Sequence, residues 1–146
     1  MNLVRVAHQS AVQDRAFRRL LGLAVFNPTD DRITRLLAEF DQHPDRRLFG
    51  LYQSDTLVGV TGIERLAPGR ATLLHIAVDP LHQRQGAGRH MLEQVAAQEA
   101  LTYLTAETDH EAVEFYRRAG FSVASLGEQY PGVERFQCLW EVAGSE

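Results

Sequence analysis

Several features that define whole classes of protein are scarce or missing in this chain of 146 residues. Its single cysteine, Cys138, allows no internal disulfide, which is typical of a reducing compartment. No apolar run approaches the roughly 20 residues that a transmembrane helix needs, and the N-terminal stretch lacks the apolar centre of a signal peptide. Repeats and linker-like stretches are missing too. We therefore expect one cytoplasmic domain, residues 1–146, with no membrane partner.

Positive charge is also in short supply. The chain has 15 lysine and arginine residues against 19 aspartate and glutamate residues, which gives a net charge of −4. Domains that bind nucleic acid usually carry a basic face, so we expect no nucleic-acid partner. His82 and His90 flank a glycine-rich segment but lack the spacing of metal ligands, so we also expect no metal.

The spacing of the apolar residues predicts a mixture of strands and helices. Strands are expected at residues 3–7, 48–52, 57–64, 71–78, 101–107, 121–125 and 136–142, with a polar loop at 127–132. Helices are expected after the caps Ser10 and Thr29 or Asp30, after Gly88, and after the capping-box pair Thr108 and Glu111. This order predicts an α/β protein with a mixed, mostly antiparallel sheet. Residues 73–107 should form its one right-handed parallel β-α-β unit.

The most informative stretch is a glycine loop between a strand and a helix. The apolar strand at residues 73–78 ends at Asp79 and Pro80, and Gly86 and Gly88 lead into the next helix. The first N–H groups of a helix have no partner within the helix and attract anions. Glycines in such a turn allow a ligand to approach the backbone closely. The loop therefore predicts a site for a phosphorylated ligand.

Two sequence motifs carry a resemblance to a known family. The first is Gln83-x-x-Gly86-x-Gly88 after an apolar strand, and the second is the segment 112–121, which contains Phe115-Tyr116 and ends in Gly120-Phe121. Together they resemble the two signatures of the GNAT superfamily of N-acetyltransferases. The resemblance implies a three-layer fold in which two neighbouring strands splay apart. It also implies that acetyl-CoA is the co-substrate.

The resemblance carries several roles onto residues of this chain. The strand residues that match those holding the pantetheine arm are Ile76, Ala77 and Val78. The loop residues that match those holding the pyrophosphate are Gln83, Arg84, Gln85, Gly86, Ala87, Gly88 and Arg89. Asp109 stands where the family often has an asparagine that contacts the cofactor. Because a carboxylate cannot donate a hydrogen bond, Asp109 either contacts the cofactor differently or only caps a helix.

The implied reaction is direct transfer of an acetyl group to a primary amine of a small molecule or peptide. Tyr116 matches the tyrosine that acts as general acid in many family members, although its place on an apolar helix face also fits core packing. A backbone N–H near Val78 suits the oxyanion. The candidate general bases are Glu107, His75 and Glu64; each can equally be an ordinary surface or core residue.

Other interpretations stay open. The chain can be a non-catalytic module that binds acyl-CoA, and the segment 112–121 also resembles part of metal-dependent glyoxalase-like enzymes. A Rossmann or P-loop protein is excluded, because the third glycine and the Gly-Lys pair are missing. Tyr130, Glu134 and Arg135 can form a wall of the substrate site, a contact in a homodimer or a plain surface connection. The acceptor amine is not identified by the sequence.

Overall fold

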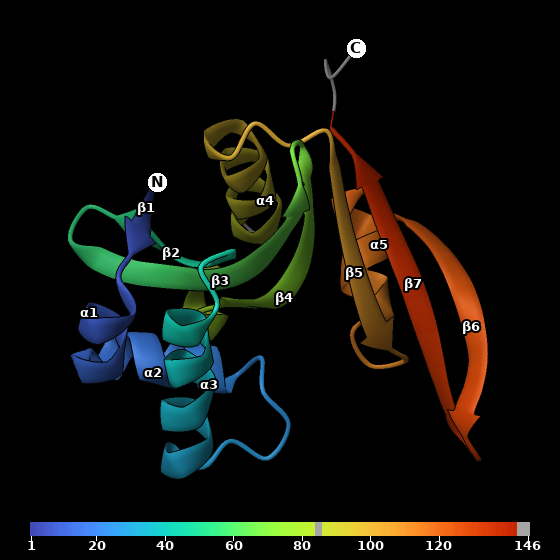
Figure 1. Cartoon of the computed structure of the whole chain (residues 1–146), viewed down its shortest axis with the longest axis horizontal. Helices are drawn as coiled ribbons and strands as arrows, with labels where there is room; N and C mark the ends of the chain where they lie inside the picture. Colours follow the sequence, from blue (N-terminus) through green and yellow to red (C-terminus); the bar gives the residue numbers. More distant parts are fainter. Residues whose placement is uncertain (84–85, 143–146) are drawn as a thin grey trace.

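The computed structural model describes residues 1–83 and 86–142, and its centre is a seven-stranded sheet with helices on both faces (Figure 1). The strands are β1 (Asn2–Val6), β2 (Arg46–Gln53), β3 (Thr56–Ala67), β4 (Arg70–Val78), β5 (Tyr103–Asp109), β6 (Ser122–Tyr130) and β7 (Val133–Glu141). The α-helices are α1 (His8–Gln13), α2 (Arg15–Gly22), α3 (Asp30–Gln42), α4 (Ala87–Gln98) and α5 (Val113–Ala119), and Pro80–His82 form the 3-10 turn η1. No helix among these residues has the length and apolar character that crossing a bilayer requires.

The strand order in the sheet is β1-β2-β3-β4-β5-β7-β6. Only β4 and β5 run parallel, and α4 connects them; every other neighbouring pair is antiparallel. The predicted mixed sheet with one parallel β-α-β unit is therefore confirmed.

The parallel pair is short. It starts with Arg70 beside Tyr103 and ends with Thr72 beside Thr105. Beyond this point β4 stays paired with β3 and β5 stays paired with β7, so the two strands diverge. This splay, visible as an open V in Figure 1, confirms the expected splayed strand pair and divides the sheet into two halves.

Each face of the sheet has its own hydrophobic core. One core lies under α4 and α5 and contains Met91, Leu92, Tyr116 and Phe121 with the inward residues of the strands. The other lies under α1, α2 and α3 and is built around Phe17, Leu20, Leu37 and Phe40. The three-layer arrangement follows from these two apolar helix faces.

The first helical segment differs from its prediction. The sequence pattern predicts one helix capped by Ser10, but the structure has two short helices, and Ser10 lies inside α1. Asp14 adopts an extended conformation between them, and its carboxylate accepts a 3.2 Å hydrogen bond from the Phe17 N–H. The predicted cap at Thr29 is confirmed, since its hydroxyl accepts a 3.1 Å bond from the Arg32 N–H.

The predicted capping box at Thr108 and Glu111 is wrong. Thr108 is a buried residue of β5, and α5 starts only at Val113. Asp109 supplies the polar contact before the helix instead. The predicted polar loop at 127–132 is also shorter than expected, because β6 and β7 extend to a tight turn at Pro131 and Gly132.

Candidate active site

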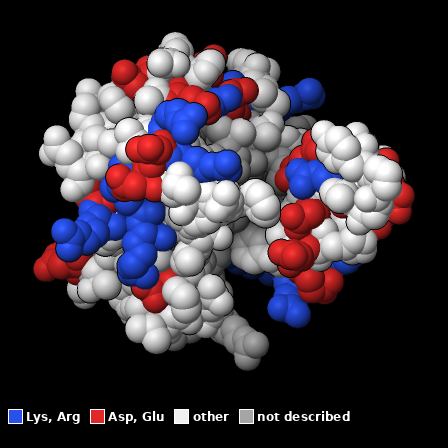
Figure 2. All heavy atoms as spheres, turned by 90° about the horizontal axis from the view of Figure 1, so that it is seen from below, with Lys and Arg blue, Asp and Glu red and all other residues white. Residues whose placement is uncertain are grey.

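The unpaired edge of β4 forms one wall of the candidate site. The Asp79 N–H donates a 2.8 Å bond to the Val58 carbonyl of β3. Because backbone groups alternate in direction along an antiparallel strand, the N–H groups of Ile76 and Val78 face away from β3, whereas that of Ala77 faces β3. The edge that bears Ile76 and Val78 therefore faces the gap left by β5. Figure 2 shows the molecule hollowed between a larger part and a smaller lobe when it is seen from below.

The start of α4 borders the same gap. Gly86 is its N-cap and has a left-handed conformation with φ of +75°, which favours glycine. A Cβ at Gly86 would meet no atom within 4 Å, so the conformation and not the space explains the residue. Ahead of it, the Gln83 amide donates a 3.1 Å bond to the Val78 carbonyl. The predicted contacts Arg84 and Gln85 lie outside the described residues.

Gly88 shows how three elements converge. A Cβ at this position would lie 2.7 Å from Cε1 of Phe115 and 3.9 Å from Cγ2 of Val78. The end of β4, the first turn of α4 and α5 therefore meet at one glycine, which is required because there is no room for a side chain. Phe115 was not singled out from the sequence as a residue of the site. Its position beside Tyr116 in the second motif was the available signal.

Two further residues of the predicted cofactor loop, Ala87 and Arg89, do not point a free polar group at the gap. Ala87 is buried in the core beneath the loop. Arg89 is exposed and forms an ion pair with Glu93 one turn along α4, with 3.0 Å between Nε and Oε1. The guanidinium of Arg89 would have to leave this exposed pair, which is worth little, in order to contact a phosphate.

Tyr116 lies on α5 in the core beside the site. Tyr116 is only 8% exposed, and its ring packs edge-on against the rings of Phe115 and Phe121 at centroid distances of 5.2 and 5.1 Å. Burial raises the pKa of the Tyr116 phenol to about 12, with smaller contributions from Cys138 and Asp109. The phenol is thus protonated at neutral pH. Within the described part of the chain its hydroxyl makes no hydrogen bond to the protein, which leaves its proton available to a ligand.

Asp109 ends β5 and holds the turn before α5. One of its carboxylate oxygens accepts hydrogen bonds from the N–H groups of Glu111 and Ala112, at 3.0 and 3.1 Å. Asp109 thus contacts the turn before α5, whereas the N-cap of α5 itself is Ala112, which has no side-chain cap hydrogen bond.

The candidate bases are not brought together. His75 faces α3 beside the Phe40 ring. Burial first and the Arg46 charge second lower its pKa to about 4, against smaller opposing effects of Glu39 and the Ala24 backbone. Glu64 is bound to Arg46, with 2.7 Å between the Arg46 Nε and the carboxylate. Across the splay, exposed Glu107 pairs with Arg135 at 3.3 Å.

Metal ligands do not cluster in the described ranges, where no three histidine, cysteine, aspartate or glutamate side chains come together as a metal-holding group. Tyr130 is 71% exposed at the end of β6, and Glu134 contacts His110 and Ser125. These contacts tie the β6–β7 turn to the loop before α5.

The comparisons with known proteins agree with this geometry. The model of the acetyltransferase (GNAT) family matches residues 11–121, and the chain therefore belongs to this family. It is 34% identical over 93 residues to the N-alpha-acetyltransferase RimI of Mycobacterium tuberculosis; the match covers 60% of this chain and 59% of that relative's length. The chain thus spans less than two thirds of this relative.

Solved structures share the whole fold. A GNAT-family protein from Desulfovibrio desulfuricans superimposes with a TM-score of 0.77 at 26% identity, over 97% of this chain and 99% of the other. An aminoglycoside 6'-N-acetyltransferase complexed with coenzyme A gives a TM-score of 0.70 at 13% identity, over 97% of each chain. Family membership thus places the chain among the GNAT acetyltransferases. The glyoxalase-like interpretation is wrong, because that fold needs two βαβββ modules and this chain has one seven-stranded sheet.

Proposed function

We propose that this chain, as one domain over residues 1–146, transfers the acetyl group of acetyl-CoA to a primary amine of a small molecule or peptide by direct attack. The observation that carries the proposal is the splay of the sheet. β4 leaves β5 after Thr72, and the free edge at Ile76 and Val78 borders the start of α4. The CoA complex of a protein with the same fold supports the choice of cofactor.

The residues around the gap fit CoA. Its pantetheine arm contains two amides, which can pair with an unpaired strand edge as an added strand does. Ile76 and Val78 supply that edge, and the first turn of α4 offers unpaired backbone N–H groups to a pyrophosphate, with open space at its N-cap Gly86. We assign Gln83, Arg84, Gln85, Ala87 and Arg89 to the remainder of this cofactor loop. Acetyl-CoA supplies the thioester carbonyl that the amine attacks.

We assign the general acid to Tyr116. Its pKa of about 12 keeps the phenol protonated at every physiological pH, so it can donate a proton to the leaving thiolate. His75 is a poor base for an amine, because an imidazole with a pKa of about 4 holds a proton weakly. Glu107 stays the preferred general base, because it lies on β5 at the splay and is exposed. The other route is transfer of the amine proton to water. We assign Asp109 to the turn before α5 and not to the cofactor.

The test is an amine panel followed by release of the CoA thiol, with acetyl-CoA binding measured by calorimetry. The sequence contains no lysine, so acetylation of a lysine side chain of the enzyme cannot contribute to the signal. Turnover with at least one amine supports the proposal. Binding without thiol release across the panel favours a non-catalytic acyl-CoA module, and no binding at millimolar acetyl-CoA contradicts both functions.

The cellular setting is part of the same proposal. We place the enzyme in the cytoplasm, where acetyl-CoA and amine acceptors are both available, and we keep a homodimer through the β6–β7 turn as a prediction. Sedimentation of the purified chain at several concentrations tests the dimer.

A further inference from the structure

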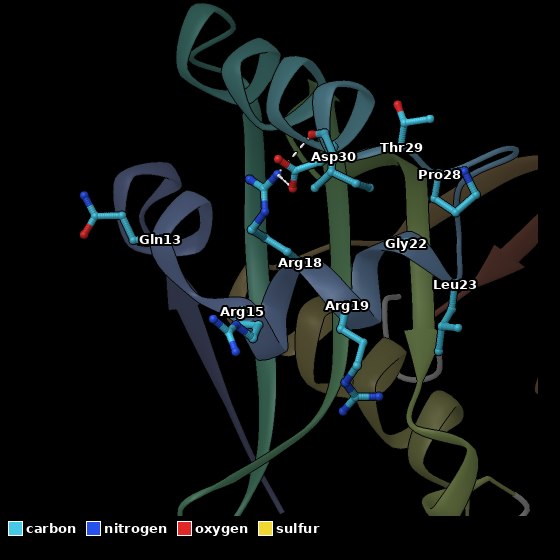
Figure 3. Close-up of a pocket in the computed structure, with 10 residues that line it drawn as sticks. Gln13, Arg15, Arg18, Arg19, Gly22, Leu23, Pro28, Thr29 and Asp30 are labelled. Atoms are coloured by element: carbon cyan, nitrogen blue, oxygen red, sulfur yellow. Dashed lines mark hydrogen bonds and ion pairs between the residues drawn. The ribbon is translucent and has the colours of Figure 1, made fainter.

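A cavity of about 570 Å³ lies between α2 and α3, outside the splay of the sheet (Figure 3). Its lining comes from the end of α1, from α2 and from the start of α3. The lining residues are Gln13, Arg15, Arg18, Arg19, Gly22, Leu23, Pro28, Thr29, Asp30 and Ile33. Three of them are arginines from a single helix, at spacings that place them on one side of it. The sequence signal for this cluster is the run Arg15-x-x-Arg18-Arg19.

One of the three arginines serves the fold. Arg18 donates to the Asp30 carboxylate at 2.6 Å, to the Asp30 carbonyl at 3.0 Å and to the Thr34 hydroxyl at 2.8 Å. It also reaches the Val12 carbonyl at 3.3 Å. Its side chain is largely buried, and Figure 3 shows the two dashed contacts that tie it to Asp30. Arg18 and Asp30 therefore neutralise each other and leave little free charge.

The other two arginines keep unused donors. Arg15 is exposed and has no ion pair within residues 1–83 and 86–142. Arg19 is 57% exposed and uses only Nη2, which lies 3.1 Å from the Asp79 carboxylate. Its Nη1 and Nε have no partner in the described part of the chain. Arg15 and Arg19 stand one helical turn apart and so present two guanidinium groups to one ligand.

One lining residue of the cavity, Arg19, contacts the residue that follows the free β4 edge. Asp79 directly follows Val78, the last residue of the free β4 edge, and the Arg19 bond joins α2 to that point. An acceptor whose amine lies in the gap beside the free β4 edge would extend past Arg19 toward Arg15 if it followed α2. The net charge of −4 on its own would favour cationic amines, but steering depends on where charge lies, and this surface carries three arginines against Asp30 and Asp79.

We infer that the α2–α3 cavity is a subsite for an anionic group of the acceptor, held by Arg15 and Arg19. The inference rests on the proposed acetyl transfer and names its substrate class: a peptide whose α-amine is acetylated and that carries an acidic side chain within its first residues. A guanidinium matches a carboxylate with two parallel N–H donors, which selects a carboxylate over an amide or a cation.

The experiment compares six-residue peptides that differ at one position. Each begins with alanine and carries glutamate, glutamine or lysine at its second, third or fourth residue. We expect kcat/KM for the best glutamate peptide to exceed that of its glutamine twin by roughly tenfold at low salt, and the ratio to shrink as salt rises. Arg15→Gln and Arg19→Gln should each remove most of this ratio.

The matched controls are Arg32→Gln and Arg35→Gln, two exposed arginines of α3 that do not line the cavity. They remove the same charge and should keep the ratio. A second readout needs no turnover: the N-acetylated glutamate peptide should bind to wild type and to both controls, but several-fold more weakly to the Arg15 and Arg19 variants.

The outcomes separate the two proposals. Equal kcat/KM for the glutamate, glutamine and lysine peptides, or a preference that survives in the Arg15 and Arg19 variants, overturns the subsite while acetyl transfer stands. If no amine releases CoA thiol, the proposed function fails, and the binding of the acetylated peptide still decides the subsite. Equal binding by all variants then overturns it.

Discussion

At the scale of single residues, Tyr116 offers the clearest test of the chemistry. Tyr116→Phe removes one hydroxyl that makes no protein hydrogen bond within the described ranges and keeps the ring that packs on Phe115 and Phe121. We expect kcat to fall by about 10²-fold, the usual contribution of a general acid, with the Kd for acetyl-CoA unchanged. Steady-state kinetics and calorimetry measure the two quantities. Unchanged turnover would show that the proton comes from another donor.

The same residue predicts the shape of the pH profile. Because the pKa of Tyr116 is raised to about 12, its acid form persists through pH 10. The rate should therefore climb as the acceptor amine loses its proton and should show no falling limb below pH 10. His75, with a pKa of about 4, should give no inflection between pH 6 and 7. A bell-shaped profile centred near pH 7 would contradict both assignments.

His75 also predicts how stability depends on pH. The unfolded chain binds a proton at His75 near pH 6.5, whereas the folded chain binds it only near pH 4. Falling pH therefore favours unfolding across this window. The shift corresponds to about 3 kcal/mol of the free energy of unfolding, present above pH 6.5 and lost by pH 4. Urea unfolding at several pH values should show this loss, and His75→Leu should reduce it.

The control for that experiment is His43→Gln, which changes an exposed histidine at the end of α3. It should leave the slope of stability between pH 6.5 and 4 as in wild type. An equal slope in wild type and in the His75 variant would show that His75 is not buried as described.

The conformation of a residue could be predicted from the sequence where it depends on a local rule. Gly86 and Thr29 are examples, because a left-handed turn and a helix cap depend on neighbours in the chain. The partners of charged side chains could not be predicted. Arg46 meets Glu64 across a sheet register, and Arg135 meets Glu107 from a strand 28 residues away. These contacts weaken two of the candidate bases, and no local spacing reveals them.

At the scale of elements, the glycine loop combines two different requirements. Position 86 favours glycine because of its left-handed conformation, with φ of +75°, although the surrounding space is empty. Gly88 needs room, since Phe115 occupies the place of a side chain. Gly86→Ala should destabilise by about 1 kcal/mol from backbone strain alone, and Gly88→Ala by about 1–3 kcal/mol from overpacking. Thermal unfolding measures both changes.

A second substitution distinguishes the two causes. Phe115→Leu shortens the side chain that Gly88→Ala would strike, so the double variant should recover part of the lost stability. The same change cannot relieve backbone strain at Gly86, so that pair should be additive. Coupling at Gly86, or its absence at Gly88, would contradict the stated reasons for the two glycines.

The boundaries of elements were less predictable than their existence. The apolar period runs through residues 11–21 without a break, yet Asp14 interrupts it by capping α2 through its own side chain. Thr108 and Glu111 have the spacing of a capping box, but pairing of β5 with β7 extends the strand through Asp109. In both places the sequence correctly predicted a helix, but a competing hydrogen bond moved the boundary of that helix.

At the scale of the whole molecule, the function depends on a sheet that is joined at one end and open at the other. The join consists of the three residue pairs between β4 and β5, with the Thr72 and Thr105 hydroxyls 3.1 Å apart. Gly69 adds to it, because its carbonyl accepts bonds from the N–H groups of Thr102 and Tyr103 at 2.7 and 3.0 Å. A short join fixes the angle of the splay and hence the width available to a pantetheine arm.

Buried charge reinforces this join. Glu99 lies between α4 and β5 with its side chain 6% exposed, and it pairs with Arg47 of β2 and Arg65 of β3. Arg65 also donates to the Glu99 carbonyl at 2.8 Å. The chain entering β5 is thus fastened to the other half of the sheet, on the side opposite the gap.

Glu99→Gln should therefore lower the free energy of unfolding, although Glu99 lies away from the candidate site. It leaves Arg47 and Arg65 without their carboxylate, and because both are partly exposed we expect a loss of about 2 kcal/mol, less than for a fully buried pair. Glu93→Gln, which breaks the exposed pair with Arg89 on the same helix, should cost under about 0.5 kcal/mol. If the join sets the splay, Glu99→Gln should also raise the Kd for acetyl-CoA at temperatures where the protein is still folded, while Glu93→Gln should not. Equal effects of the two variants on stability and Kd would show that the join does not govern the gap.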